Sequence, residues 1–176
     1  SGADLDEARA GTITRSPTWE QVSAGIAGLP CLTVAALNGT LAGGAFGMAL
    51  ACDLRVAVPT AKFFYPVLKN GFLPQPRDAA RMADLIGPAR TKMILMGGQK
   101  IEASTALAWG LVDELVDRGD MADRLHDLTA AAANGPEAVL TGIKRLVSSG
   151  GSDQTVKDAF AAVYEADGAA LERLRN

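Results

Sequence analysis

Two adjacent glycines, Gly43 and Gly44, mark the place where this sequence can do chemistry through its backbone. They lie in the stretch NGTLAGGAFGMALACD, residues 38–53, where a turn leads into a short apolar helical segment. The first N–H groups of a helix have no carbonyl partner inside the helix, and glycines leave such groups accessible. Donors of this kind stabilise an anion or an oxyanion. The alternative is that the glycines only allow close backbone packing.

The spacing of the glycines excludes two common phosphate-binding motifs. Gly39, Gly43, Gly44 and Gly47 do not match the dinucleotide-binding fingerprint, and no Lys-Ser or Lys-Thr pair follows them as in a P-loop. The stretch therefore predicts a donor site of another kind.

The composition is that of an ordinary globular chain. Its 176 residues suffice for one domain with a buried core, and 48% are hydrophobic and 21% charged. A net charge of −3 without a basic patch argues against a nucleic-acid partner. No apolar run approaches the roughly 18 residues of a membrane span, and nothing at the start is typical of a signal peptide. We therefore expect a cytoplasmic protein that does not act at a membrane.

The cysteines and the histidine argue against a metal or triad site. Cys31 and Cys52 lie in apolar segments, and we expect both to be reduced and packed as small hydrophobic side chains. His126 is the only histidine, and it lies in a polar helical stretch. We therefore expect no histidine-based metal site and no Ser-His triad.

Hydrophobic periodicity and helix-ending residues predict the elements around the glycines. The predicted strands cover residues 31–37, with both faces buried, 54–58, 62–65 and 111–116. The predicted helices cover residues 16–27, 79–86, 89–96 and 102–109, with three further pieces after residue 120. Strands concentrated early, each followed directly by helices, predict an α/β protein with a core of short parallel strands.

Residues 71–78 contain two prolines and are predicted to form a loop that brings Arg77 and Asp78 to the start of a helix. Asp78 fits the N-cap of the helix at 79–86, where its carboxylate would accept a hydrogen bond from a free backbone N–H.

Four segments in order resemble the enoyl-CoA hydratase/isomerase, or crotonase, family. They are SGADL at residues 1–5, NGTLAGGAFGMALACDLRVA at 38–57, AKFFYPVLKNGFLP at 61–74 and LIGPARTKMILMGGQKIEASTALAWGLVDELV at 85–116. One such segment would be a weak match, whereas four at matching spacing are specific.

The resemblance implies an α/β, crotonase-like fold, a stacked ββα superhelix with a C-terminal helical region. Residues 1–119 would be the core and residues 120–176 a helical oligomerisation region, in a homotrimer or a dimer of trimers. Family members have strands before the first segment and a helical tail after the last element. We therefore expect that the N-terminal strands are missing, because the chain is either a fragment or the ordered part of a longer protein.

The resemblance also implies a coenzyme A thioester as substrate or ligand and no tightly bound cofactor. The thioester carbonyl in such a site lies between two backbone N–H groups, which correspond to Ala3 and Gly44. The residues that correspond to the ligand-binding loops are Gly2, Ala3, Asp4, Leu5, Gly43 and Gly44. One such donor typically lowers the barrier by about 2.7–4 kcal/mol.

Two glutamates that hydratases of the family use are absent, because the corresponding positions hold Gly47 and Val67. Neither side chain can exchange a proton, so ordinary hydration is not expected unless carboxylates come from elsewhere. The predicted function is that of an acyl-CoA lyase, isomerase or hydrolase that stabilises an enolate or oxyanion. The alternative is a non-catalytic acyl-CoA-binding relative or an oligomerisation module.

Residues 75–80, QPRDAA, replace a glycine-rich turn that the family has beside the acyl group. Arg77 is then a candidate clamp for a carboxylate, Asp78 a candidate acid or base, and Tyr65 a candidate hydroxyl donor. The alternative is that Asp78 only caps its helix, that Arg77 is solvated and that Tyr65 belongs to the core.

Overall fold

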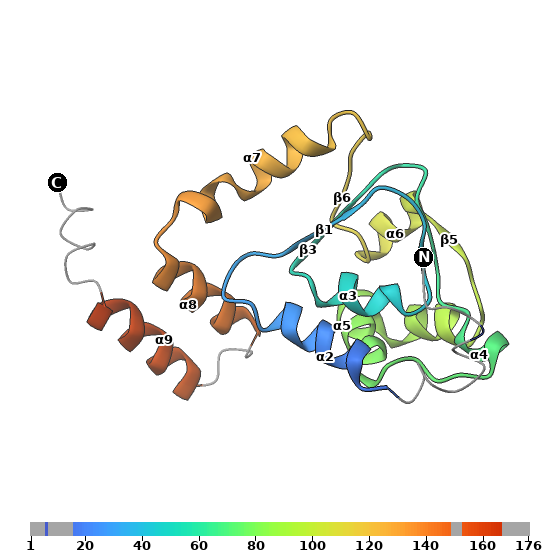
Figure 1. The fold of residues 1–176 in the computed structure, drawn as a ribbon, viewed down its shortest axis with the longest axis horizontal. Coiled ribbons are helices and arrows are strands. Elements are labelled where there is room, and N and C mark those ends of the chain that lie inside the picture. The colour runs from blue at the N-terminus through green and yellow to red at the C-terminus, as the bar shows by residue number, and fades with distance from the viewer. Residues whose placement is uncertain (1–5, 7–15, 149–152, 167–176) are drawn as a thin grey trace. The chain divides into compact units, whose positions relative to one another are not determined.

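The computed structural model describes residue 6, residues 16–148 and residues 153–166 (Figure 1). The described chain divides into two compact units. The first contains residues 6, 16–28 and 33–125, and the second contains residues 29–32, 126–148 and 153–166. The residues singled out for chemistry from 43 to 78 all belong to the first unit.

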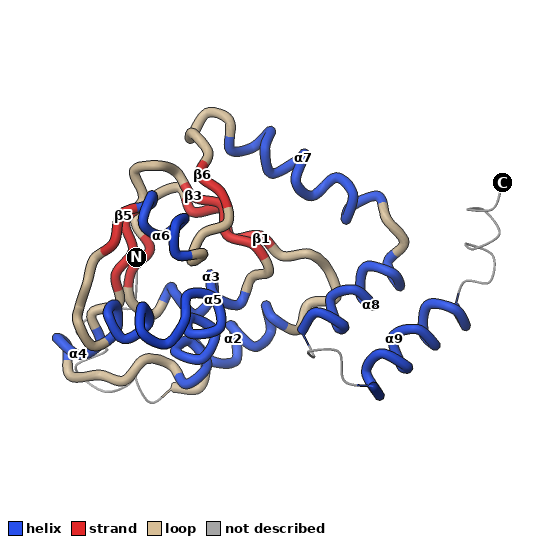
Figure 2. Tube along the Cα trace, turned by 180° about the vertical axis from the view of Figure 1, so that it is seen from behind, coloured by secondary structure: helices blue, strands red, loops and turns tan. Residues whose placement is uncertain are grey.

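The strands described in the first unit form two three-stranded sheets (Figure 2). In the first sheet β3 (Leu54–Ala57) lies between β1 (Val34–Leu37) and β6 (Glu114–Leu115), and both pairings are parallel. This arrangement confirms the prediction of short parallel strands. In the second sheet β4 pairs in parallel with β2 and antiparallel with β5. The bounds of these strands are Leu41–Ala42 for β2, Lys62–Phe64 for β4 and Ile101–Glu102 for β5.

Two helices of the first unit pack against the helix that follows the glycine-rich turn. The short helix α3 packs against α2 and α5, and six of its seven residues are buried (Figure 1). The bounds are Thr18–Ala27 for α2, Ala45–Ala51 for α3, Val67–Asn70 for α4, Pro76–Leu95 for α5 and Ala103–Trp109 for α6. Helix α3 therefore lies at the centre of the part of the fold that holds the candidate residues.

Helix α5 corrects the prediction for residues 71–78. It begins at Pro76 and not after Asp78, with Gln75 as its N-cap. A proline at the first helical position costs nothing, because the N–H group that it lacks would have no partner there. The predicted break at residues 87–88 is confirmed, since Gly87 has φ 80° and ψ 158° inside the element.

The first strand is less buried than its sequence predicts. Strand β1 lies at the edge of its sheet among the described strands, its residues are partly exposed, and Ala36 is exposed. Cys31 is also exposed, so the expectation that it packs in the core is wrong, whereas neither cysteine is bridged. A run of apolar residues does not distinguish an edge strand from a central one, because both have the same period.

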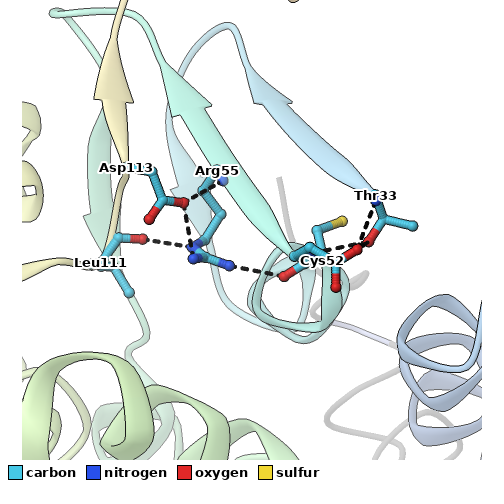
Figure 3. Close-up of polar contacts among 6 residues, drawn as sticks. Thr33, Cys52, Arg55, Leu111 and Asp113 are labelled. Carbon is cyan, nitrogen blue, oxygen red and sulfur yellow. Dashed lines mark hydrogen bonds and ion pairs between the residues drawn. The ribbon is translucent and has the colours of Figure 1, made fainter. Parts of the chain in front are cut away.

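A buried arginine joins the strands of the first sheet (Figure 3). The side chain of Arg55 donates to the carbonyl oxygens of Leu111 and Cys52 at 3.0 and 2.9 Å. Its Nη2 atom and its backbone N–H both reach Oδ2 of Asp113, at 3.0 and 2.7 Å. The guanidinium is therefore compensated by hydrogen bonds and by a carboxylate, which is what a buried charge requires.

A second polar contact holds β1 against the residue before β3 (Figure 3). Oδ2 of Asp53 accepts hydrogen bonds from the backbone N–H and the hydroxyl of Thr33, both at 2.8 Å. The backbone N–H of Asp53 donates in turn to Thr33 Oγ1 at 3.0 Å. The register of the parallel pair is thus fixed by side chains as well as by the strand ladder.

The second unit is helical. Helix α7 (Met121–Asn134) begins in the first unit and ends in the second, followed by α8 (Glu137–Ser148) and α9 (Asp153–Ala166). Helices α8 and α9 pack on each other at Gly142, where an added Cβ would lie 3.4 Å from Val163. The described helices include none that is both long and apolar enough to cross a lipid bilayer.

Candidate functional site

The glycine-rich turn holds, next to α3, a backbone donor that no described residue accepts from. Gly43 has φ 59°, which a side chain would disfavour, and its N–H donates to the carbonyl oxygen of Phe64 at 3.2 Å. Gly44 precedes α3 with φ −58°, and its N–H donates no hydrogen bond to any described residue. A Cβ at Gly44 would lie 3.9 Å from Trp19, an ordinary contact distance. Backbone conformation therefore explains Gly43, whereas packing does not require a glycine at 44.

The partner predicted for this donor cannot be placed. Ala3 and its neighbours Gly2, Asp4 and Leu5 lie outside the described residues. Their roles as a second oxyanion donor and as ligand-binding loop stay predictions.

Asp78 and Tyr65 form a buried pair. Asp78 lies in the first turn of α5 and is 0% exposed, and Tyr65 follows β4 directly and is 4% exposed. The Tyr65 hydroxyl donates to Oδ2 of Asp78 at 2.9 Å. Oδ1 of the same carboxylate has no hydrogen-bond partner among the described residues. The ring of Tyr65 stacks on Phe46 of α3, with 5.4 Å between the centroids, which holds the phenol in place.

The Asp78 carboxylate fills the space that a side chain at Gly47 would occupy. A Cβ built on Gly47 would lie 2.7 Å from Oδ1 and 3.2 Å from Oδ2 of Asp78. Gly47 also donates its N–H to the Gly44 carbonyl at 3.2 Å, so the two glycines belong to the same turn at the start of α3. The structure thus brings Asp78 to the glycine-rich stretch from a distant part of the sequence.

Burial controls the protonation of this pair. It raises the pKa of Asp78 to about 6, while the Tyr65 hydrogen bond and the charge of Arg81 act to lower it and the charge of Glu20 acts to raise it. The pKa of Tyr65 is raised well above its usual range by burial and by the negative charge of Asp78. Near neutral pH the phenol therefore keeps its proton, and both forms of the carboxyl group are accessible.

Charged residues of α2 and α5 surround the pair. Nη1 of Arg81 donates to the buried Ser23 hydroxyl at 3.0 Å, and that hydroxyl donates to the Glu20 carbonyl at 3.2 Å. Nε of Arg77 lies 2.9 Å from Oε1 of Glu20. This contact is an ion pair without hydrogen-bond alignment, because both carboxylate oxygens of Glu20 lack a hydrogen-bond partner among the described residues. The side chain of Arg77 is 62% exposed.

The interpretation of Asp78 as a helix cap is wrong, because Gln75 is the N-cap and the Asp78 side chain bonds Tyr65 instead. Tyr65 is both a core residue and a hydroxyl donor. Arg77 pairs with Glu20, and no contact joins it to the Tyr65–Asp78 pair among the described residues. Val67 is buried at the start of α4.

Sequence reasoning missed the contact between Gly47 and Asp78 and the roles of Ser23 and Arg81. No spacing rule connects residues on two helices that are far apart in the chain, so no local signal could have found them. The described residues include no cluster of histidine, cysteine, aspartate or glutamate that could hold a metal ion.

Comparison with known proteins gives consistent matches. The family described as enoyl-CoA hydratase/isomerase matches residues 1–167. A carnitinyl-CoA dehydratase from Salmonella enteritidis PT4 (strain P125109) is 30% identical over 152 residues, which are 83% of this chain and 57% of that protein. The carnitinyl-CoA dehydratase of Escherichia coli (strain K12) is 29% identical over 127 residues, 72% of this chain and 48% of that protein. The chain thus spans about half the length of these relatives.

Solved structures share the fold. An enoyl-CoA hydratase/isomerase family protein from Hyphomonas neptunium superposes with a TM-score of 0.85 at 27% identity, over 99% of this chain and 71% of that one. Pseudomonas aeruginosa DspI superposes with a TM-score of 0.80 at 26% identity, over 95% of this chain and 69% of that one. The α/β fold is therefore the one these proteins adopt.

Proposed function

The chain belongs to the enoyl-CoA hydratase/isomerase family, and we propose that it binds a coenzyme A thioester and stabilises an enolate or tetrahedral oxyanion with backbone N–H groups. The names of the carnitinyl-CoA dehydratases support a coenzyme A thioester as the ligand class. The proposal needs no tightly bound cofactor and no metal. It assigns the oxyanion to the N–H groups of Gly44 and, by motif position, of Ala3.

The observation that carries the proposal is the N–H of Gly44, which has no hydrogen-bond partner among the described residues and lies in the turn that also contacts a buried carboxylate. A donor held by a rigid turn needs no reorganisation when negative charge develops on the ligand. Gly43 fixes that turn through its bond to Phe64, and the burial of α3 keeps it in place. Each such donor is expected to lower the barrier by about 2.7–4 kcal/mol.

The residue types at positions 47 and 67 support the reaction classes that we propose. Gly47 and Val67 cannot exchange a proton, so hydration by the family's two glutamates is not proposed. The remaining classes that use a stabilised enolate or oxyanion are lyase, isomerase and hydrolase reactions of acyl-CoA. The proposed ligand-contacting groups include Asp78 and Tyr65, with Arg77 available for a charged acyl group at the exposed side.

The finer architecture is also part of the proposal. Family membership supports a stacked ββα superhelix, with residues 1–119 as the core and residues 120–176 as an oligomerisation region in a homotrimer or a dimer of trimers. Light scattering on the full-length protein would test this assembly. A monodisperse monomer would contradict it.

The decisive experiment is a turnover assay with a panel of acyl-CoA thioesters. The full-length protein is incubated with saturated, 2,3-unsaturated, 3-hydroxy and carboxyacyl thioesters, and each reaction is followed by mass spectrometry. We expect at least one thioester to be converted. Binding of the thioesters without any conversion would contradict the enzyme proposal and favour the non-catalytic alternative.

A further inference from the structure

We propose that Asp78 is a catalytic residue that takes a proton from the bound thioester, and later returns it, through Oδ1, while Tyr65 positions the carboxylate by binding Oδ2. The inference rests on the proposed function, because its ligand is the same coenzyme A thioester. It adds a named proton-transfer group and therefore a reaction step.

The first support is the unequal bonding of the two carboxylate oxygens. Oδ2 accepts the Tyr65 hydrogen bond at 2.9 Å, whereas Oδ1 has no partner among the described residues although the side chain is 0% exposed. Buried carboxylate oxygens are normally satisfied, because losing hydration without a replacement is costly. Because its partner oxygen is held by Tyr65, Oδ1 is a fixed acceptor that no described residue uses and that a bound ligand could contact.

The second support is the position of this oxygen. Oδ1 is the atom that lies nearest to the side-chain direction of Gly47, at 2.7 Å from its ideal Cβ. Any side chain at 47 would meet the carboxylate, so the glycine provides the space in which Oδ1 lies against α3. Because Gly47 donates to the Gly44 carbonyl, the carboxylate and the unpaired Gly44 N–H flank the same helical turn. We therefore place the proposed ligand at that turn, with contacts to both groups.

The step balances without a co-reactant. The C–H bond next to the thioester carbonyl breaks, and its proton forms an O–H bond with Asp78 Oδ1. The electron pair of that bond moves into the enolate, whose oxygen accepts the Gly44 N–H hydrogen bond. The O–H proton of neutral Asp78 is then replaced by a proton or deuteron from the solvent, and its return to the same carbon gives exchange. In an unsaturated acyl chain, return of the proton to another carbon gives isomerisation.

The groups that face Asp78 permit both the protonated and the ionised carboxyl group. They are the neutral Tyr65 phenol after β4, the cation of Arg81 one turn further along α5 and the anion of Glu20 of α2. Burial raises the pKa of Asp78 to about 6, so a small fraction of the carboxyl group is protonated at pH 7. Such a group can act as a base that accepts the proton and then as an acid that donates it.

The test is hydrogen exchange at the carbon next to the thioester. The full-length protein is mixed with butyryl-CoA in D₂O, and deuterium incorporation is measured by mass spectrometry. Asp78→Asn is expected to slow exchange by about 10²–10⁴-fold while the Kd for butyryl-CoA changes little. The matched control is Asp84→Asn, an exposed carboxylate on the same helix, which is expected to leave exchange unchanged.

A pH profile of exchange by the unmutated protein tests the proposal even where Asp78→Asn does not fold. The rate is expected to fall as the pH decreases through about 6, where Asp78 takes up a proton. Tyr65→Phe removes a hydrogen bond that favours the charged form, so it is expected to shift the inflection to higher pH, which a purely structural role of Tyr65 would not do.

The outcomes separate the two proposals. Undiminished exchange or turnover in folded Asp78→Asn would overturn the role of Asp78 and leave the proposed function standing. A wild-type protein that binds butyryl-CoA, shows no exchange and converts no thioester of the panel would overturn both. An exchange rate that does not fall as the pH decreases from 8 to 4 would also contradict the proton-transfer role.

Discussion

Arg55 and Asp78 are both buried charged residues of the first unit, yet their surroundings differ. Arg55 is 3% exposed, and its side chain makes hydrogen bonds to two carbonyl oxygens and to Asp113 (Figure 3). Asp78 is 0% exposed, and only one of its two oxygens has a partner among the described residues. The Arg55 guanidinium thus has protein acceptors for its hydrogen bonds, whereas Oδ1 of Asp78 accepts none from the described residues.

This difference separates a structural role from a functional one. A compensated buried charge fixes how elements meet, and removing its partner destabilises the fold. An incompletely paired charge costs stability, so its presence at the glycine-rich turn calls for a function. The N–H of Gly44, like Oδ1 of Asp78, has no hydrogen-bond partner in the part of the chain that the structure describes. The Thr33–Asp53 contact, like those of Arg55, is structural.

The largest expected effect concerns the unpaired donor. Gly44→Pro keeps the φ of −58° that proline favours and removes the N–H, so we expect kcat for any converted thioester to fall by about 10²–10³-fold. Gly44→Ala is the matched control, because it retains the N–H and its Cβ fits at 3.9 Å from Trp19. An equal fall of kcat in both variants would show that the added side-chain atoms, and not the loss of the N–H donor, reduce activity.

The pH dependence of stability should distinguish the two charges. The folded-state pKa of Asp78, about 6, lies above the ordinary value of 3.8 for an aspartate, so the folded state binds this proton more tightly. The resulting stabilisation, about 2–3 kcal/mol, is fully present below pH 4 and is lost as the pH rises through 6. Urea unfolding from pH 4 to 8 measures it. Asp78→Asn should lose this dependence, whereas Asp113→Asn should keep it.

Removing the partner of Arg55 should destabilise the fold without acting on chemistry. Asp113→Ala leaves the guanidinium buried with fewer acceptors, and we expect the free energy of unfolding to fall by roughly 2–3 kcal/mol. The loss is smaller than for a fully buried pair because the Asp113 side chain is 38% exposed. Denaturant unfolding measures the change, and kcat of the folded fraction is expected to be unchanged. A large drop in kcat would break the distinction between the two regions.

The smallest effect is expected for Gly47→Ala. The new Cβ would lie 2.7 Å from Asp78 Oδ1, so the carboxylate or α3 must shift, at a cost of about 1–3 kcal/mol in stability. Gly25→Ala, in α2 with nothing within 4 Å, is the matched control and should be neutral or stabilising. Thermal unfolding compares them. Adding Asp78→Ala to Gly47→Ala should recover part of the loss, and strict additivity would argue against the contact.

The sequence was most informative where the pattern is local. Parallel strands, the break at Gly87 and the turn at Gly43 and Gly44 all follow from periodicity and from the conformational preferences of glycine and proline. The start of α5 was misplaced because Pro76 fits a first helical position as well as a loop. The burial of Asp78 and its contact with Tyr65 could not be predicted, because a carboxylate near the start of a helix usually caps that helix. Only tertiary packing places the Asp78 side chain in the interior. Whether Tyr65 is core or donor depended on the same packing.

The shared volume at positions 47 and 78 also limits the routes by which this chain can diverge from its relatives. A carboxylate can come from α3 or from α5, but the two cannot occupy the gap together. A lineage that changes position 47 first passes through a crowded, less stable protein, and one that changes position 78 first passes through a protein without the carboxylate. A switch between the two arrangements is therefore expected to need paired substitutions or a period of relaxed selection.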